Sequence, residues 1–214
     1  MDLRYMRFHA SAALSTRFAA RTRARRMAWF LGRMKVRGGE RIIDLGGLPD
    51  FWSGASVPLD ITVVNLPGTL PPLPVPSHHR LRLIEGDARA MAGHPDGSYD
   101  IAVSNSVIEH VGGPDDRRRL AHEVRRLAPR YWVQTPSIWF PIEAHTYMPF
   151  WWFYPEALRT RIKRRWHQKL PAWTRMIEGT TVLSWREMQD LFPDAELITE
   201  RVAGLPKSYI AYRA

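Results

Sequence analysis

The chain has 214 residues, of which 45% are hydrophobic, and a formal net charge of +10 at pH 7. This composition suits one globular domain with a sizeable core and excludes a disordered chain. The absence of cysteine excludes disulfides, thiolate metal sites and cysteine nucleophiles, and it favours a reducing, cytoplasmic location. Since no apolar run approaches the roughly 18 residues of a membrane span, no transmembrane helix is expected.

The positive charge is concentrated in two blocks, one near the N-terminus and one in the C-terminal half. Such blocks favour anionic partners such as nucleic acid, acidic substrates or an anionic membrane surface. Solvated helix faces have the same composition, so both interpretations stay open. The residues are Arg17, Arg21, Arg23, Arg25, Arg26, Arg33, Lys35 and Arg37 in the first block, and Arg159, Arg161, Lys163, Arg164, Arg165 and Lys169 in the second.

The first 35 residues are rich in Arg, Ala and Ser, a composition that transit peptides share. Apolar residues within it, among them Phe18, Phe30 and Met34, lead directly into the first predicted strand. We therefore expect a structural helix over residues 14–37. The apolar stretch "MAWFLG" is too short for a secretory signal.

Short apolar runs separated by turn signals predict a sheet. Five of them read as parallel strands buried on both faces, and a good helix follows the fourth at residues 115–128. Two later runs are expected to pair as antiparallel strands. The prediction is an α/β fold with a doubly wound, Rossmann-like sheet, mostly parallel with an antiparallel C-terminal strand. The runs are 41–45, 61–66, 81–86, 99–105 and 130–135, followed by 195–202 and 208–213.

Two connections are unusual. The proline-rich segment 67–79 predicts an extended crossover where a helix is usual, and its adjacent His78 and His79 lack partners at metal-ligand spacing. The long, aromatic-rich excursion 136–192 is typical of a substrate cap. We predict one domain, 1–214, with a basic helical region at 1–40, a cofactor-binding core at 41–135, the cap at 136–192 and terminal strands at 193–214. No metal site is predicted.

Polar residues follow four successive strands. The first strand ends in "DLGG", the second in Asn65, the third in "EGDARAM" with Asp87, and the fourth in "SNSVIEHV" with Asn105. Ligands of doubly wound sheets bind beyond the carboxyl ends of the strands, so these four positions predict one ligand pocket. A single glycine turn would be weak evidence, because such turns are often only structural.

Together these strand ends resemble the class I S-adenosylmethionine-dependent methyltransferases, especially the type-11-like bacterial group, over residues 38–135. Leu48 and Asp50 stand where that family usually has further glycines. The resemblance implies S-adenosylmethionine as the cofactor and implies the following cofactor-binding residues. These are Asp44, Gly46 and Gly47 at the methionine end, Asn65 at the ribose, Asp87 and Ala88 beside adenine, and Asn105 and Ser106 along the methyl-donor cavity.

Methyl transfer to a hydroxyl or protonated amine benefits from a general base. The catalytic candidates are His145 first and His110 second, with Glu143 and Tyr147 beside them in "PIEAHTY". Histidine suits proton transfer near neutral pH. Glu143 is expected to orient His145 or to pair with an arginine, and His110 has the alternative role of anchoring its loop.

The predicted function is S-adenosylmethionine-dependent methyl transfer to a small molecule such as a sugar, a lipid-linked glycan or a secondary metabolite. Segment 149–173 joins aromatic to basic residues, which favours an anionic or lipid-linked substrate and peripheral contact with the inner membrane surface over nucleic acid. Two alternatives stay open: an RNA methyltransferase, and a degenerate, non-catalytic fold that acts as a membrane-surface or binding module. The sequence does not predict the oligomeric state or the acceptor atom.

Overall fold

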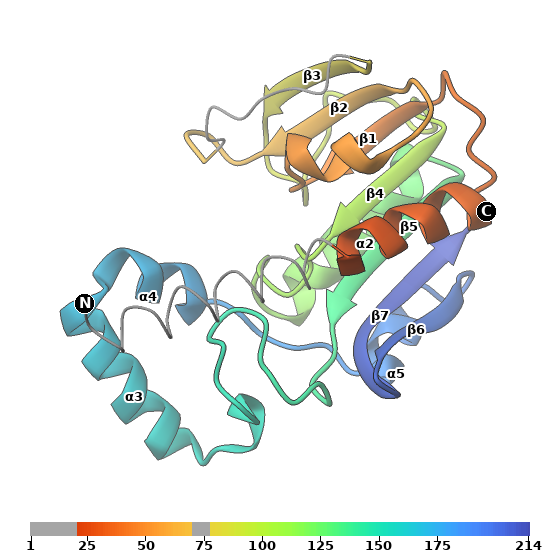
Figure 1. Cartoon of the computed structure of the whole chain (residues 1–214). Coiled ribbons are helices and arrows are strands. Elements are labelled where there is room, and N and C mark those ends of the chain that lie inside the picture. Colours follow the sequence, from red (N-terminus) through yellow and green to blue (C-terminus); the bar gives the residue numbers. More distant parts are fainter. Residues whose placement is uncertain (1–20, 70–77) are drawn as a thin grey trace, which may run out of the picture.

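The computed structural model describes residues 21–69 and 78–214. Its centre is a seven-stranded sheet in the order β3-β2-β1-β4-β5-β7-β6 (Figure 1). All of these strands fall on the predicted apolar runs, with ends shifted by three residues at most. They are β1 (Arg41–Leu45), β2 (Asp60–Asn65), β3 (Arg80–Glu85), β4 (Ile101–Asn105), β5 (Arg130–Pro136), β6 (Glu196–Val202) and β7 (Leu205–Arg213).

Strands β1 to β5 are parallel, and β7 pairs antiparallel with both β5 and β6. The predicted fold class is therefore confirmed. In the register, Asp44 on β1 pairs with Val63 on β2 and with Val103 on β4. The carboxyl ends of these central strands consequently lie at one edge of the sheet, where the polar residues were expected to meet.

Strand β3 departs from the prediction that every parallel strand is buried on both faces. None of its six residues is buried, and Leu83 is exposed. The reason is its place at the edge of the sheet, with only β2 as a partner among the described strands. Alternating arginines, Arg80 and Arg82, pair there with Asp60 of β2, as suits an edge strand.

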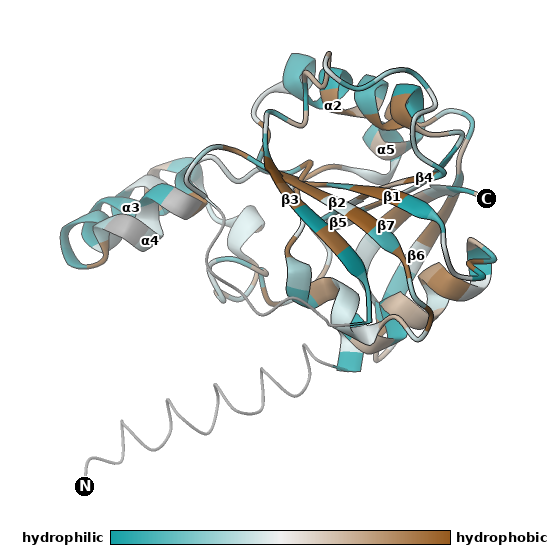
Figure 2. Ribbon diagram, turned by 90° about the horizontal axis from the view of Figure 1, so that it is seen from above, coloured by the Kyte–Doolittle hydropathy of each residue, from teal (hydrophilic) through white to brown (hydrophobic). Residues whose placement is uncertain are grey.

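Helices cover both faces of the sheet (Figure 2). On one face, α2 (Pro114–Leu127) and α5 (Trp185–Leu191) pack through residues such as Val124 and Met188. On the other face lie an N-terminal helix and the short 3-10 helix η1 (Pro49–Gly54), which contribute Phe30 and Trp52 to the core. The sequence after the first strand leaves room only for η1, so the N-terminal helix covers much of this face.

The N-terminal helix occupies residues 21–33 in the described part of the chain. It ends four residues before the predicted limit, where Lys35 adopts a left-handed φ of 49°. The predicted helical residues 14–20, with Arg17 and Phe18, lie outside the described residues. So do residues 70–77 of the predicted proline-rich crossover.

Within the predicted cap, η2 (Trp151–Phe153), α3 (Glu156–Lys169) and α4 (Pro171–Glu178) extend away from the sheet (Figure 1). A stack of Trp151 on Trp166 holds η2 against α3. Farther along the chain, Leu183 and Phe192 pack into the core on the face of the sheet that α2 and α5 cover. Across residues 21–69 and 78–214, no helix has the length and apolar character needed to cross a bilayer.

Candidate functional site

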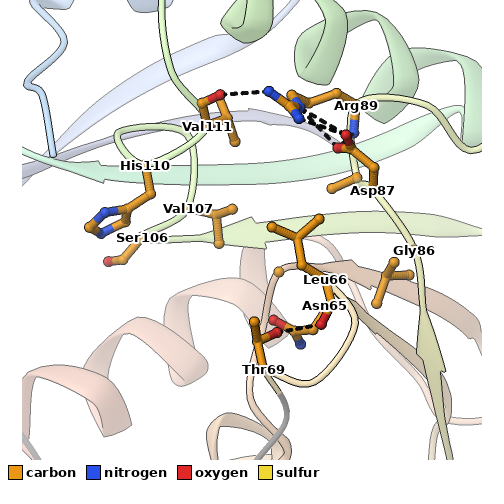
Figure 3. A pocket seen from close by; sticks show the side chains of 13 residues that line it. Asn65, Leu66, Thr69, Gly86, Asp87, Arg89, Ser106, Val107, His110 and Val111 are labelled. Carbon is orange, nitrogen blue, oxygen red and sulfur yellow. Dashed lines mark hydrogen bonds and ion pairs between the residues drawn. The ribbon is translucent and has the colours of Figure 1, made fainter. Parts of the chain in front are cut away.

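A cavity of about 310 Å³ lies at the carboxyl ends of the central strands, which is the size of a small ligand pocket. Figure 3 shows Asp87 and Arg89 on one side of it and Asn65 and Thr69 on another. Segments that follow β1, β2, β3 and β4 all contribute, as the sequence predicts. The lining residues are Gly46, Val64, Asn65, Leu66, Thr69, Gly86, Asp87, Ala88, Arg89, Ser106, Val107, His110 and Val111.

The two glycines after β1 are required by close contacts. Gly46 has a left-handed φ of 79°, and a Cβ there would lie 2.5 Å from a methyl carbon of Val107. A Cβ on Gly47 would lie 1.8 Å from the Asp44 carboxylate. The backbone of this loop therefore packs too closely against Val107 and Asp44 to carry side chains at these two positions. The loop nevertheless has fewer glycines than the family that the sequence resembles.

Asp44 supports this loop from below. Its side chain is fully buried, and its Oδ2 accepts a hydrogen bond of 2.8 Å from the indole Nε1 of Trp52. Its Oδ1 has no hydrogen-bond partner within the described residues. Burial raises the pKa of Asp44 to about 7, against the opposing effect of the Trp52 bond. Of the three residues predicted at the first loop, Gly46 lines the cavity, whereas Asp44 and Gly47 do not.

At the ends of the next two strands, Asn65 and Asp87 both line the cavity. The Asn65 amide donates to the carbonyl of Gly47 at 2.7 Å, which leaves its side-chain oxygen as an acceptor for hydroxyl groups. The Asp87 carboxylate is held by the Arg89 guanidinium at 2.7 and 2.9 Å, and Arg89 also donates to Asp116. Arg89 is a lining residue that the sequence prediction missed, although it lies two positions after Asp87.

At the end of β4, Asn105 and Ser106 join a buried polar network. Arg26 of the N-terminal helix donates to Asn105 Oδ1 and Gln134 Oε1, each at 2.9 Å, and to Glu200 at 2.7 Å. Ser106, which has a left-handed φ of 56°, donates to the same Gln134 oxygen. Ser106 lines the cavity, whereas Asn105 lies behind it. Arg26 was predicted only as part of a charged block, and its role appears only in three dimensions.

A histidine pair stands beside the cavity. His110 of the cavity wall and His145 of the cap approach each other with their Nε2 atoms 2.9 Å apart. The other ring nitrogen of His145 lies 2.9 Å from Glu143 Oε1, and that of His110 lies 3.2 Å from Thr180 Oγ1. The structure thus brings together three of the four predicted catalytic residues. Tyr147, the fourth, is 69% exposed.

The surroundings of the pair shift the pKa values of the two histidines in opposite directions. Burial alone would lower the pKa of His145, but the hydrogen bond and negative charge of Glu143 outweigh it and raise that pKa. Desolvation, reinforced by His145, lowers the pKa of His110 to about 4. Burial alone would raise the pKa of Glu143, yet its bonds to His145 and the Thr146 amide lower it. Glu143 is therefore a carboxylate, and His145 is the histidine that holds a proton more readily.

Glu109 is the second residue of this region that the sequence prediction missed as a functional group. Its side chain is 1% exposed, and its Oε2 accepts a 3.1 Å hydrogen bond from Thr135. Its Oε1 is buried without a partner within the described residues. Burial raises the pKa of Glu109 to about 7. The signal was present in "SNSVIEHV", since Glu109 directly precedes His110.

Comparison with known proteins identifies the fold. Residues 68–130 match the family model described as a methyltransferase domain. A S-adenosylmethionine-dependent methyltransferase from Thermotoga maritima has a TM-score of 0.54 at 14% identity, with 98% of this chain and 95% of that chain covered. Residues 68–130 thus resemble a methyltransferase domain, and the chain has the fold of S-adenosylmethionine-dependent methyltransferases. The predicted resemblance to this group is confirmed at the level of the fold and of the family match over residues 68–130.

Two further solved structures share the methyltransferase fold. Geranyl diphosphate methyltransferase, solved with its cofactor, has a TM-score of 0.54 at 13% identity, covering 88% of this chain and 84% of that chain. Phosphoethanolamine N-methyltransferase 2 of Haemonchus contortus has a TM-score of 0.54 at 12% identity, with coverages of 82% and 38%. No curated protein sequence matches this chain.

The residues around the cavity fit this cofactor. Because Gly46 has no side chain, the first loop can pack against Val107 at the cavity wall. The side-chain oxygen of Asn65 is an acceptor suited to ribose hydroxyls. The cavity wall between Gly86 and Arg89 includes Ala88, a small residue that leaves room for a flat ring. Which residues contact each part of the cofactor stays a prediction, with Asp44, Gly47 and Asn105 acting from behind the wall.

Proposed function

We propose that the methyltransferase transfers the methyl group of S-adenosylmethionine to a hydroxyl group of a small acceptor that is anionic or lipid-linked. The observation that carries this proposal is the chain of contacts Glu143–His145–His110, which ends on the cavity wall. A histidine oriented by a carboxylate is the arrangement that proteins use to accept a proton. A carbon acceptor or a neutral amine would make less use of it.

When bound, S-adenosylmethionine supplies an electrophilic methyl group. The side chains and backbone of the cavity wall, with Ser106 and Val107 next to the histidines, would hold the reactants in line and exclude water. The histidine pair would take or displace the proton of the acceptor hydroxyl as the new bond forms. A positioned acid–base group of this kind contributes about 10²- to 10⁴-fold to a rate.

The surface of the cap supports an anionic or lipid-linked acceptor. No residue of α3 is buried, and the helix exposes Arg161, Arg164 and Arg165. Basic residues beside exposed apolar side chains are typical of elements that lie in the interface of an anionic membrane. The large apolar side chains exposed on the cap and its approach are Trp139, Ile142, Tyr147, Phe150, Phe153, Leu158 and Leu170.

The fold does not select the acceptor. Proteins with this fold include a phosphoethanolamine N-methyltransferase and a geranyl diphosphate methyltransferase, whose names specify different acceptors. The proposed acceptor class therefore rests on the cap and the histidine pair of this chain. With such a cap the enzyme would work at the surface of an anionic membrane.

The test uses S-adenosylmethionine carrying a labelled methyl group, incubated with the enzyme and either a bacterial lipid extract or total RNA. We expect the label in a lipid-extractable product and not in RNA. Label in RNA would overturn the acceptor class in favour of nucleic acid. Absence of both labelled product and cofactor binding would overturn the enzymatic function and favour a binding module.

A further inference from the structure

The histidine pair leaves two ring nitrogens facing each other. Their Nε2 atoms are 2.9 Å apart, and the rings meet edge to face with centroids 4.6 Å apart. Because the Glu143 carboxylate is only an acceptor, the Nδ1 of His145 donates to it and the Nε2 of neutral His145 carries a lone pair. If His110 likewise donates from Nδ1 to Thr180, two lone pairs face each other. A cation or a proton must then lie between them.

Glu109 supplies a third group to the same place. One oxygen of Glu109 and one nitrogen each of His110 and His145 all lie within 4.8 Å of one another. Its Oε1 is buried and has no partner within the part of the chain that the structure describes. An ionised carboxylate oxygen that is buried and unpaired is costly, so Glu109 must either take up a proton or bind a positively charged partner there.

We propose that Glu109, His110 and His145 form a binding site for a single divalent transition-metal ion. Two imidazoles and one carboxylate are a recurrent ligand set for catalytic Zn²⁺ and for other first-row metals, with further positions left open. With metal–nitrogen bonds of about 2.1 Å, a nitrogen separation of 2.9 Å gives an angle of about 90° at the ion. This angle suits five- or six-coordinate geometry with water in the open positions.

The residues around the three ligands have the arrangement that metal sites require. Ligating histidines usually donate their second ring nitrogen to a carboxylate or another oxygen, which fixes the ring and the tautomer. Glu143 accepts in this way from His145, and Thr180 Oγ1 lies 3.2 Å from the second ring nitrogen of His110, where it can accept from the metal-binding tautomer. The ligands come from the loop after β4 and from the cap, so the ion would also fasten the cap to the sheet.

The role of the ion, unlike its binding, rests on the proposed function. Because His110 lines the cavity, an open coordination position would be accessible to the acceptor hydroxyl. A bound divalent metal lowers the pKa of a coordinated hydroxyl or water. The histidines would then act by holding the ion that displaces the proton.

The test is calorimetric titration of ZnCl₂ and of MnCl₂ into the full chain, produced without a polyhistidine tag. We expect one ion per chain, with an affinity at least tenfold weaker in Glu109→Gln and in His145→Gln. The matched control is His122→Gln, which removes a histidine whose side chain is 67% exposed on α2. Absence of binding in the wild type, or binding in both ligand variants as tight as in the wild type, would show that only a proton lies between the nitrogens.

Two further measurements separate this inference from the proposed function. Thermal unfolding of His145→Gln, which replaces a partly exposed residue, checks that lost metal binding does not reflect lost folding. Methyl transfer is measured before and after chelation in the same preparations. Site-dependent metal binding without methyl transfer would sustain the metal site and refute the function. Methyl transfer that is unaffected by chelation, in a protein that binds no metal, would support the proposed function and refute the metal site.

Discussion

The two sides of the cavity are assembled in different ways. The proposed cofactor side is built from short segments at the ends of successive strands, so neighbouring strands fix the positions of Gly46, Asn65 and Asp87. The proposed acceptor side joins His110, which lies just beyond β4, to His145 and Thr180, which are 35 and 70 positions away in the sequence. Residues of the first kind follow from the sheet, whereas those of the second kind depend on how the excursion folds back.

The largest effect is expected on the cofactor side, from Gly47→Ala. The new Cβ would lie 1.8 Å from the buried Asp44 carboxylate, so the loop must move or the protein must unfold in part. We expect cofactor binding to fall below detection in a calorimetric titration. Gly93→Ala is the control, since a Cβ at Gly93 meets no atom within 4 Å. Normal binding by Gly47→Ala would refute the packing that the first loop is said to require.

On the acceptor side, His145→Ala is expected to lower kcat by about 10²- to 10⁴-fold. The cofactor affinity should change little, because His145 lies in the cap and outside the cavity lining. Steady-state kinetics and a cofactor titration on the same preparation check this. Tyr147→Phe, at an exposed position, should leave both quantities unchanged. An equal loss of cofactor affinity and turnover in His145→Ala would indicate a structural role.

The N-terminal helix is expected to stabilise the fold behind the cavity through the hydrogen bonds of Arg26. Substitution Arg26→Met leaves Glu200, which is 1% exposed, without its ion pair. Removing one partner of a buried pair costs about 3–5 kcal/mol of stability. Urea unfolding measures this loss. Arg41→Met is the matched control, because its pair with Asp100 is largely exposed and should change stability little. Similar effects of the two substitutions would contradict a buried network.

The smallest effect expected is a pH dependence from Asp44. Its pKa is about 7 in the folded protein and 3.8 as the reference value. Between these values the unfolded chain binds fewer protons, so stability falls as pH rises, by about 1.4 kcal/mol for each pH unit. Asp44→Asn lacks this slope. Urea unfolding at pH 5 and pH 8 should therefore show the wild type losing stability relative to Asp44→Asn. A constant difference would mean that Asp44 is ionised at both pH values.

This contrast also explains how much the sequence predicted. The seven strands, their order of pairing at the C-terminus and the polar strand ends follow from local patterns, because apolar runs and turn residues reflect each strand separately. The edge position of β3 does not, since an apolar run does not reveal how many neighbours a strand has. Residues 183–192 were predicted as part of the cap, but Leu183, Met188 and Phe192 of this segment pack into the core.

The candidate site shows the same limit. His145, His110 and Glu143 were predicted as a group from their chemistry and their place in the sequence. Glu109, Arg26 and Thr180 were not, because their contacts join residues far apart in the chain. The expectation of no metal site came from searching local spacing only, whereas the proposed ligands Glu109, His110 and His145 meet through the fold. Long-range polar clusters are therefore the part of a site that a sequence reveals least.

The central claim is that the cofactor lies in the strand-end cavity with its methyl group directed at the histidine pair. A crystal structure with S-adenosylhomocysteine bound tests this most directly. We expect the adenosine between Asn65 and Ala88, and the sulfur on the side of the cavity formed by Ser106 and His110. A product molecule bound outside the cavity, or a sulfur on the side away from His110, would contradict it.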